Sequence, residues 1–154
     1  MADRLIAHEV FGFLRPEQVS AISEAAERIS LSAGETVYER GRKADHFYTV
    51  LEGDVTLRLP VESGVSIVID ELTRGEMFGS CVCFSMDSYA LSAQCVTDSV
   101  LLKIENGALK KLMDEDLKMG YALQTKISAL YFRRYIDTAL KLQAVVMNLS
   151  IQPG

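Results

Sequence analysis

The sequence lacks several residue types that mark particular classes of protein. It has no tryptophan, two histidines, three prolines and three cysteines among 154 residues. An odd, small number of cysteines argues against a disulfide framework. Two isolated histidines cannot supply the histidine cluster that a metal-dependent barrel enzyme needs. No apolar run approaches the roughly 20 residues that span a bilayer, so we expect no membrane association.

Composition favours one folded domain in the cytoplasm. The chain is 49% hydrophobic and 24% charged, which is typical of a globular protein. Its net charge of −5 provides no basic stripe, so we expect no nucleic-acid partner. The first residues, MADRLIAHEVFGFL, show neither the apolar core nor the cleavage site of a signal peptide.

The first 30 residues have a helical pattern. Apolar residues recur there at three- and four-residue steps, namely Phe11, Leu14, Val19, Ile22, Ala25, Ala26 and Ile29. Pro16 is suited to the first turn of a helix, where its missing N–H costs nothing. We therefore predict two short helices in residues 1–30.

From residue 31 to 105 the pattern changes to that of short strands. Turn-forming glycines follow one another at positions 34, 41, 53, 64 and 75. Apolar and polar residues alternate over 55–59 and 65–69, and Gly53 and Gly64 stand where hairpin turns are expected. Regular turn signals of this kind favour a sandwich or barrel, here of about eight strands.

Residues 106–150 return to a helical pattern, with a long helix from about Leu117 to Leu149. Its second half carries apolar residues spaced 3, 4, 3, 4 and 3 apart, namely Phe132, Tyr135, Ala139, Leu142, Val146 and Leu149. This spacing is that of a coiled-coil seam. More than 30 helical residues extend about 45 Å, beyond the width of the domain. A parallel homodimer is therefore favoured, and packing within one chain is the alternative. A neighbouring stripe of Leu123, Ile127 and Leu130 is suited to packing against the strands.

Three segments of the chain are specific, namely SAGETVYERGRKADHFYTVLEGDVTL, LTRGEMFG and SAQCVTDSVLLKI. Together with the order of elements, they resemble the cyclic-nucleotide-binding domain family, in the form of the catabolite activator protein effector domain. The first segment resembles the opening strands of the family, the second the turn into its phosphate-binding cassette, and the third the strands that leave it. The resemblance covers about residues 10–140. It implies a mainly β fold, a jelly-roll β-barrel with flanking helices, as one domain over 1–154.

The resemblance also implies where a ligand would bind. In the family a glutamate at the start of the cassette helix takes the ribose hydroxyl, and a later arginine takes the cyclic phosphate. Backbone N–H groups complete the cradle, because helix N-termini favour anions. The corresponding cassette covers residues 75–93, and its candidate ligand-binding residues are Phe78, Gly79, Ser80, Cys81, Val82, Leu91, Ser92 and Ala93.

Both charged positions of the family pattern differ here. Ser80 stands at the glutamate position, and Leu91 (or Ala90 without a gap) at the arginine position. Hydrogen bonds to charged groups contribute about 1.5–3 kcal/mol, so losing the arginine weakens binding roughly 10- to 100-fold. We expect cyclic nucleotides to bind poorly unless another cation substitutes; the candidates are Arg74, Arg58, Arg42, Lys43, Arg133 and Arg134.

Other polar and aromatic residues in the cassette have two interpretations each. The serines at 80, 85, 88 and 92 either cap turns or line a neutral pocket. Tyr89 either stacks on a ring or closes the barrel. Cys81, Cys83 and Cys95 are expected to act as small hydrophobic residues. A soft-metal or redox site, or haem held by His46 or a methionine, is the alternative. We predict no metal and no cofactor.

Two function hypotheses remain. The first is a non-enzymatic regulatory or sensor module, which binds a small ligand or keeps a degenerate pocket and signals through its C-terminal helix. The second is a ligand-free homodimeric scaffold or protein-interaction domain. An enzyme is disfavoured because no nucleophile–base pair, P-loop or paired-carboxylate motif is found. No helix-turn-helix follows the long helix, so we expect no DNA binding by that route.

Overall fold

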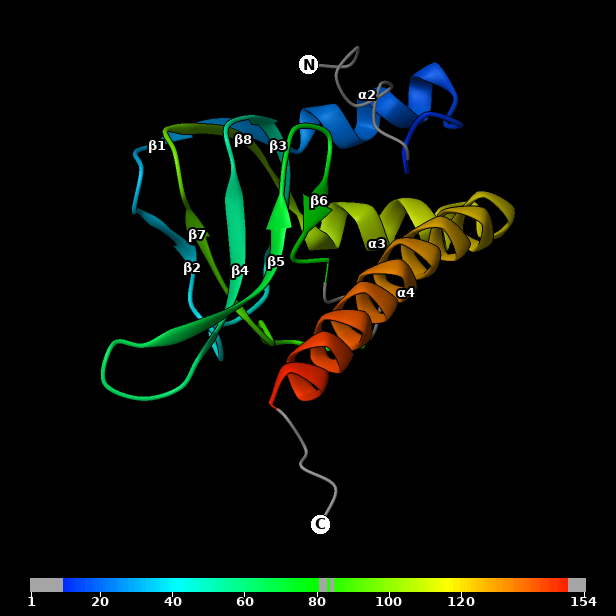
Figure 1. The fold of residues 1–154 in the computed structure, drawn as a ribbon. Coiled ribbons are helices and arrows are strands. Elements are labelled where there is room, and N and C mark those ends of the chain that lie inside the picture. The colour runs from blue at the N-terminus through cyan, green and yellow to red at the C-terminus, as the bar shows by residue number, and fades with distance from the viewer. Residues whose placement is uncertain (1–9, 81–82, 84, 150–154) are drawn as a thin grey trace.

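The computed structural model describes residues 10–80, 83 and 85–149 (Figure 1). Eight strands are found in this part of the chain, the number expected. In chain order the described elements are α2 (Pro16–Glu24), β1 (Ala26–Leu31), β2 (Thr36–Tyr38), β3 (His46–Glu52), β4 (Val55–Pro60), β5 (Ser66–Leu72), β6 (Met77–Phe78), β7 (Ser92–Cys95), β8 (Ser99–Glu105), α3 (Asn106–Glu115) and α4 (Leu117–Asn148).

The strands form two antiparallel sheets of four strands each. One sheet has the order β1-β8-β3-β6 and the other β2-β7-β4-β5. The mainly β fold with flanking helices is confirmed. The predicted closure into a barrel is not found in the described residues, because β6 has only two residues and pairs with β3 alone. The two sheets therefore face each other as separate layers.

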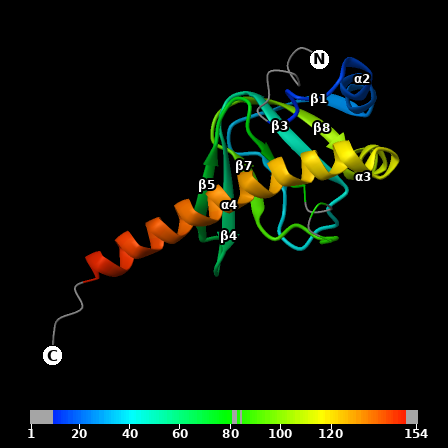
Figure 2. The ribbon, with the colours of Figure 1, turned by 90° about the vertical axis from the view of Figure 1, so that its right-hand side faces the viewer.

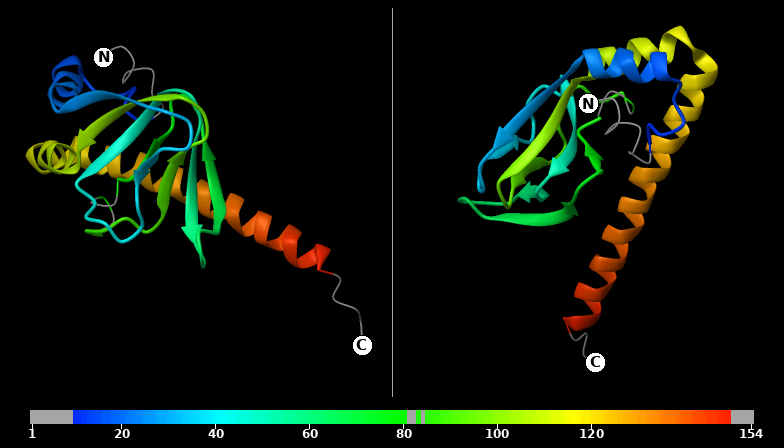
Figure 3. Two further views of the ribbon diagram at one scale, coloured as in Figure 1. Left: turned by 90° about the vertical axis from the view of Figure 1, so that its left-hand side faces the viewer. Right: turned by 90° about the horizontal axis from the view of Figure 1, so that it is seen from above.

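The helices form a third layer on the outer face of the first sheet (Figures 1 and 3). The strand β3 of that sheet is buried on both sides. Phe47 and Leu51 join the core beneath the helices, while Tyr48 and Val50 join the core between the sheets. Burial on both faces explains why the β3 sequence FYTVL is apolar except at Thr49 and does not alternate.

The helical N-terminal region is shorter than predicted. Pro16 begins α2, as expected, but the helix ends at Glu24 and β1 starts at Ala26. Ile29 satisfies a helical spacing, yet it pairs with Leu101 in β8 and packs against the core between the sheets. The long-range pairing of β1 with β8 overrides the local helical pattern. The predicted helix before Pro16 falls largely on residues 1–9, outside the described residues.

Tight turns join the strands where glycine was expected. Gly53 has φ +90°, and a Cβ there would lie 2.3 Å from the Ser99 hydroxyl. Ser63 and Gly64 both have positive φ, and the N–H of Val61 donates to the carbonyl of Val65 across their turn. Because glycine has no Cβ, it allows both the close approach and the turn.

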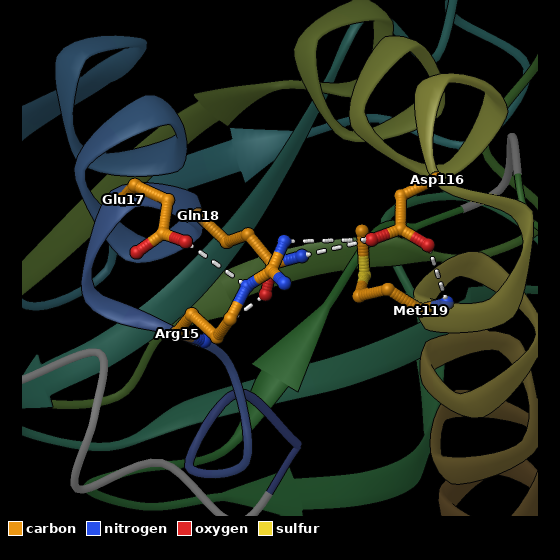
Figure 4. Close-up of polar contacts among 5 residues, drawn as sticks. All are labelled: Arg15, Glu17, Gln18, Asp116 and Met119. Carbon is orange, nitrogen blue, oxygen red and sulfur yellow. Dashed lines mark hydrogen bonds and ion pairs between the residues drawn. The ribbon is translucent and has the colours of Figure 1, made fainter.

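A polar junction connects α2 to the start of α4 (Figure 4). Asp116 is the N-cap of α4 and accepts a hydrogen bond from the Met119 N–H at 3.1 Å. Its carboxylate also accepts from the Gln18 amide at 3.3 Å and lies 3.7 Å from the Arg15 guanidinium. Asp116 therefore caps one helix and holds a second.

Helix α4 has 32 residues and packs along only its first half. Gly120 lies so close to α3 that an added Cβ would meet the Met113 carbonyl at 2.5 Å. Leu123 and Ile127 are fully buried in the core beneath the helices, and Leu130 packs at its edge, as predicted. Beyond them the helix runs past the sheets (Figures 2 and 3). None of the helices in the described ranges is long and apolar enough to cross a membrane.

Candidate functional site

The candidate cassette, residues 75–93, starts from a fixed turn. Gly75 has φ +89°, and its N–H donates to the Val50 carbonyl at 2.8 Å. The next residues form β6, which pairs with β3 and brings Phe78 opposite Tyr48. Both rings are buried and stacked, with centroids 5.4 Å apart. Phe78, expected to line a ligand site, is therefore part of the core between the sheets.

Two tyrosine rings cover the backbone of Gly79. The rings of Tyr38 and Tyr89 lie flat on each other, with centroids 3.6 Å apart and an interplanar angle of 10°. Carbon atoms of both rings lie 3.4 Å from the place where a Gly79 Cβ would be. Tyr89 is 5% exposed, and its hydroxyl donates to the His46 carbonyl at 2.6 Å. The ring of Tyr89 thus stacks on a ring of the protein itself, and the interpretation that it stacks on a ligand stays a prediction.

The aromatic group extends inward from this stack. Tyr48 lies within 5.9 Å of Tyr38, between ring centroids. Burial raises the pKa of the Tyr48 hydroxyl, and a hydrogen bond with the Tyr89 side chain opposes that rise. We refer below to Tyr38, Tyr48, Phe78 and Tyr89 as the aromatic cluster. It joins β2, β3, β6 and the segment before β7 across the space between the sheets.

Ser80 connects the cassette to α4. It is fully buried, and its hydroxyl shares a hydrogen bond of 3.0 Å with the Tyr131 hydroxyl. One further contact lies two turns earlier on the same helix, where the Gln124 amide donates to the Cys83 carbonyl at 2.8 Å. The hydroxyl that stands at the family's glutamate position is thus used to hold the helix.

The strand that leaves the cassette offers no charge. Leu91 is half-buried and packs on the core between the sheets, and Ala93 is fully buried there. The Ser92 hydroxyl accepts a hydrogen bond from the Arg40 N–H at 3.0 Å, which is turn and strand-end chemistry. Cys81 and Val82, which were also candidate ligand residues, lie outside the described residues.

An ion pair joins α4 to β5 beside the cassette. The Arg134 guanidinium lies 3.4 Å from the Asp70 carboxylate, and these side chains are 12% and 21% exposed. Arg134 also donates to the Met77 carbonyl in β6 and lies over the Tyr131 ring. One of its nitrogens, Nη1, is buried without a hydrogen-bond partner. Of the candidate cations, Arg134 thus contacts β6, the short strand near the start of the cassette.

The other candidate cations lie elsewhere on the surface. Arg58 bonds through its side chain to the hydroxyls of Thr56 and Ser66, and Arg42 pairs with Glu39 at 3.7 Å. Lys43 lies 3.6 Å from Asp45, with 81% of its side chain exposed. The side chains of Arg74 and Arg133 are also exposed.

Asn106, at the start of α3, is a buried residue that the sequence pattern did not indicate. Its amide nitrogen donates to the carbonyls of Ala44 at 3.0 Å and Gly79 at 3.4 Å. The sequence pattern also did not indicate the roles of Tyr38, Gln124 and Tyr131, because those roles depend on contacts between distant parts of the chain. The one local signal was the seven-residue interval between Gln124 and Tyr131, which places them on one helix face.

The described cysteines behave as packing residues. Cys95 is 1% exposed, and burial raises the pKa of its thiol. Cys83 is partly buried against the core beneath the helices. No group of three or more potential metal ligands occurs in the described part of the chain, and Cys81 lies outside it.

The described residues do not fit a cyclic phosphate with a ribose. Ser80 is bonded to Tyr131, Leu91 is apolar, and the tyrosine rings cover Gly79. The arrangement holds the cassette through ring stacking and neutral hydrogen bonds. Within the cassette residues that the structure describes, no nucleophile is paired with a base.

Comparison with known proteins identifies the family. The sequence model of the cyclic nucleotide-binding domain matches residues 28–116, more than half of the chain. The chain therefore belongs to the cyclic nucleotide-binding domain family, as its segments suggested.

Solved structures agree with the fold. The sensor domain of the transcriptional regulator DNR from Pseudomonas aeruginosa superposes with a TM-score of 0.75 at 23% identity, covering 86% of this chain and 89% of that one. Thermus thermophilus catabolite activator protein gives a TM-score of 0.69 at 23% identity, over 89% of this chain and 62% of that one.

Curated relatives are much longer proteins. Lysophospholipase NTE1 of Phaeosphaeria nodorum is 26% identical over 85% of this chain and 9% of its own length. Patatin-like phospholipase domain-containing protein 7 of Rattus norvegicus is 29% identical over 61% of this chain and 7% of its own. The chain thus spans less than a tenth of the length of these relatives.

Proposed function

We propose that this chain is a non-enzymatic regulatory module in which α4 responds to the position of the cassette. The observation that supports this proposal is that side chains of α4 form hydrogen bonds with cassette residues. Tyr131 bonds to the buried Ser80, and Gln124 bonds to the Cys83 carbonyl. Arg134 adds a contact to the carbonyl of Met77, which lies two residues before Gly79.

These three α4 residues act as one set because they lie on one face of the helix. Gln124 and Tyr131 are seven residues apart, and Arg134 follows three residues later, so their side chains project toward the same neighbour. A shift of residues 77–83 must therefore carry α4 with it or break these bonds. Two such arrangements that differ by a few kcal/mol are sufficient for a switch.

The family supports a sensor role without naming the ligand. The DNR relative is a sensor domain of a transcriptional regulator, and the curated relatives carry the matching region as a small part of a lipase-type protein. We place the ligand space of the module over Gly79, where the neutral, aromatic surroundings suit a planar uncharged group better than a cyclic phosphate. We propose the cytoplasm as the compartment, since the buried Cys95 is a free thiol.

A matched pair of tyrosine variants tests the coupling. Tyr131→Phe removes only the hydroxyl that bonds to Ser80, whereas Tyr135→Phe makes the same change on a tyrosine that is 64% exposed. Hydrogen exchange should become faster in peptides covering residues 77–83 with Tyr131→Phe and stay unchanged with Tyr135→Phe. Equal exchange in both variants would show that the helix does not sense the cassette.

A second candidate function is a homodimeric scaffold, and the surface of α4 favours it. The predicted seam residues of its second half are exposed, among them Phe132 at 62%, Leu142 at 62% and Leu149 at 72%. Large apolar side chains at coiled-coil spacing are stabilised by pairing with another helix. We propose that a second copy of this chain covers the seam.

Sedimentation of two aspartate variants tests the seam. Leu142→Asp places a charge in the seam, and Ala144→Asp places the same charge on the opposite helix face, where Ala144 is also exposed. The wild type and Ala144→Asp should sediment as dimers at micromolar concentration, and Leu142→Asp as a monomer. A monomeric wild type at 100 µM would refute the proposal, whatever the variants do.

A further inference from the structure

The ring of Tyr89 lies where a flat ligand would lie. It stacks on Tyr38 with centroids 3.6 Å apart and an interplanar angle of 10°, directly over the Gly79 backbone. Its outer rim is closed, since only 5% of the residue is exposed. A planar heteroaromatic ligand held between sheets would make the same contacts, a parallel stack on one face and hydrogen bonds at its edge.

The hydrogen bonds of Tyr89 complete this likeness. Its hydroxyl donates to the His46 carbonyl at 2.6 Å and accepts from the His46 N–H at 3.4 Å. A ligand edge would be held in the same way, by one backbone acceptor and one backbone donor. Tyr89 thus satisfies the polar groups at this position as well as filling the space.

The backbone around Tyr89 fixes the ring in place. The N–H of Tyr89 donates to the Arg42 carbonyl at 2.9 Å, and the Tyr89 carbonyl accepts from Gly41 at 2.8 Å. The Asp87 carbonyl accepts from Ala44 at 2.8 Å. Three backbone bonds within three residues make this a rigid insertion rather than a loose flap.

We propose that Tyr89 is a built-in occupant of the ligand space, which holds the cassette in its closed arrangement without a bound ligand. This inference rests on the proposed function in placing the ligand space over Gly79. It follows that the wild-type protein takes up no cyclic nucleotide or small aromatic molecule there. Removing the ring should open a void that accepts one, as engineered apolar cavities accept small aromatic molecules.

The test is a melting experiment with indole as the probe. Tyr89→Ala in 5 mM indole should gain about 3–6 °C in its melting midpoint, the shift expected for a dissociation constant of about 0.5 mM. The wild type and Tyr89→Phe, which keeps the ring, should gain less than about 1 °C. Tyr121→Ala, the same change at a tyrosine that is 78% exposed, controls for nonspecific effects.

Hydrogen exchange on the same samples separates this inference from the proposed function. If indole stabilises Tyr89→Ala and slows exchange in residues 124–135, both are supported. If it stabilises the variant but leaves that exchange unchanged, Tyr89 is an occupant and the coupling to α4 is wrong.

Two results would show that Tyr89 does not occupy a ligand space. One is a folded Tyr89→Ala, or the milder Tyr89→Val, that indole does not stabilise. The other is a wild type stabilised by indole or cAMP as much as the variant. If neither variant folds alone, both are refolded in the presence of indole. Recovery of folded protein then supports the proposal that Tyr89 occupies a ligand space, and no recovery contradicts it.

Discussion

The two halves of α4 both carry apolar residues at helical spacing, but they have opposite surroundings. In the first half Met119, Leu123 and Ile127 are each less than 8% exposed. In the second half Phe132, Leu142 and other large apolar residues are more than 60% exposed. Both halves have apolar residues at helical spacing, so periodicity alone does not distinguish them. The difference teaches that a helical stripe identifies a contact face and leaves open what it contacts.

The physical reason is the reach of the sheets. A 32-residue helix extends about 48 Å, while the core beneath the helices covers only its first half. At the boundary the contacts change from apolar to polar, with Tyr131 bonded to Ser80 and Arg134 paired with Asp70. The polar set therefore marks where α4 leaves the domain.

The largest expected effect is a loss of packing in the first half. Leu123→Ala should lower the free energy of unfolding by about 3–4 kcal/mol, because Leu123 is fully buried and the truncation leaves a cavity. Urea unfolding measures the loss. A loss below about 1 kcal/mol would contradict the packing of the first half of α4 in the core, since surface substitutions have effects of that size.

Breaking the ion pair at the boundary should have the next largest effect. Asp70→Asn leaves the Arg134 guanidinium buried with a neutral partner and should cost about 2–3 kcal/mol, somewhat less than a fully buried pair. Arg134→Met should cost less, because Asp70 keeps some contact with water at 21% exposure. Urea unfolding of both variants and the double variant gives the pair's interaction energy. An interaction energy near zero would show that the pair is effectively solvated.

Removing the cap at the start of α4 should have a moderate effect. Asp116→Ala loses the bond from the Met119 N–H and the contacts to Gln18 and Arg15, and should cost about 1–2 kcal/mol. Asp114→Ala is the control, since Asp114 pairs only with Lys110 on the surface, at about 0.3–0.5 kcal/mol. Thermal melting compares them. A similar melting midpoint for both variants would show that the junction does not hold α2 to α4.

The smallest effect should come from the second half of α4. Leu142→Ala should change the unfolding free energy of dilute, monomeric protein by less than about 0.5 kcal/mol, because Leu142 is 62% exposed. Repeating the unfolding at rising protein concentration tests the seam, since only a dimer makes the midpoint depend on concentration. A large loss in dilute protein would mean that this half packs within its own chain.

Much of the fold could be predicted because local chemistry decides it. Pro16 starts α2, and glycines at 53 and 64 make the expected turns because their backbone conformation excludes most side chains. The helical prediction over residues 26–29 was wrong, because pairing with β8 outweighs a short periodic pattern. Barrel closure was not found because β6 is too short to extend the sheet.

The sequence predicted where the candidate site lies in the chain, but it predicted less well which side chains contact one another there. The missing charges at Ser80 and Leu91 were evident from the sequence, as was the possibility of a stacked Tyr89. The partners were not evident: Tyr38 comes from β2, 51 residues before Tyr89, and Tyr131 comes from the opposite end of the chain. Only folding brings these side chains together, so no local pattern records them.

The sequence by itself determined the family, the order of elements and the absence of the family's charged ligand contacts in the cassette. These follow from residue types at fixed local spacing, which constrain backbone conformation and charge directly. Tertiary structure decided which half of α4 is buried, that Ser80 holds the helix, and that tyrosine rings cover Gly79. Such contacts depend on where distant segments meet, because a side chain's role is set by its neighbours in space.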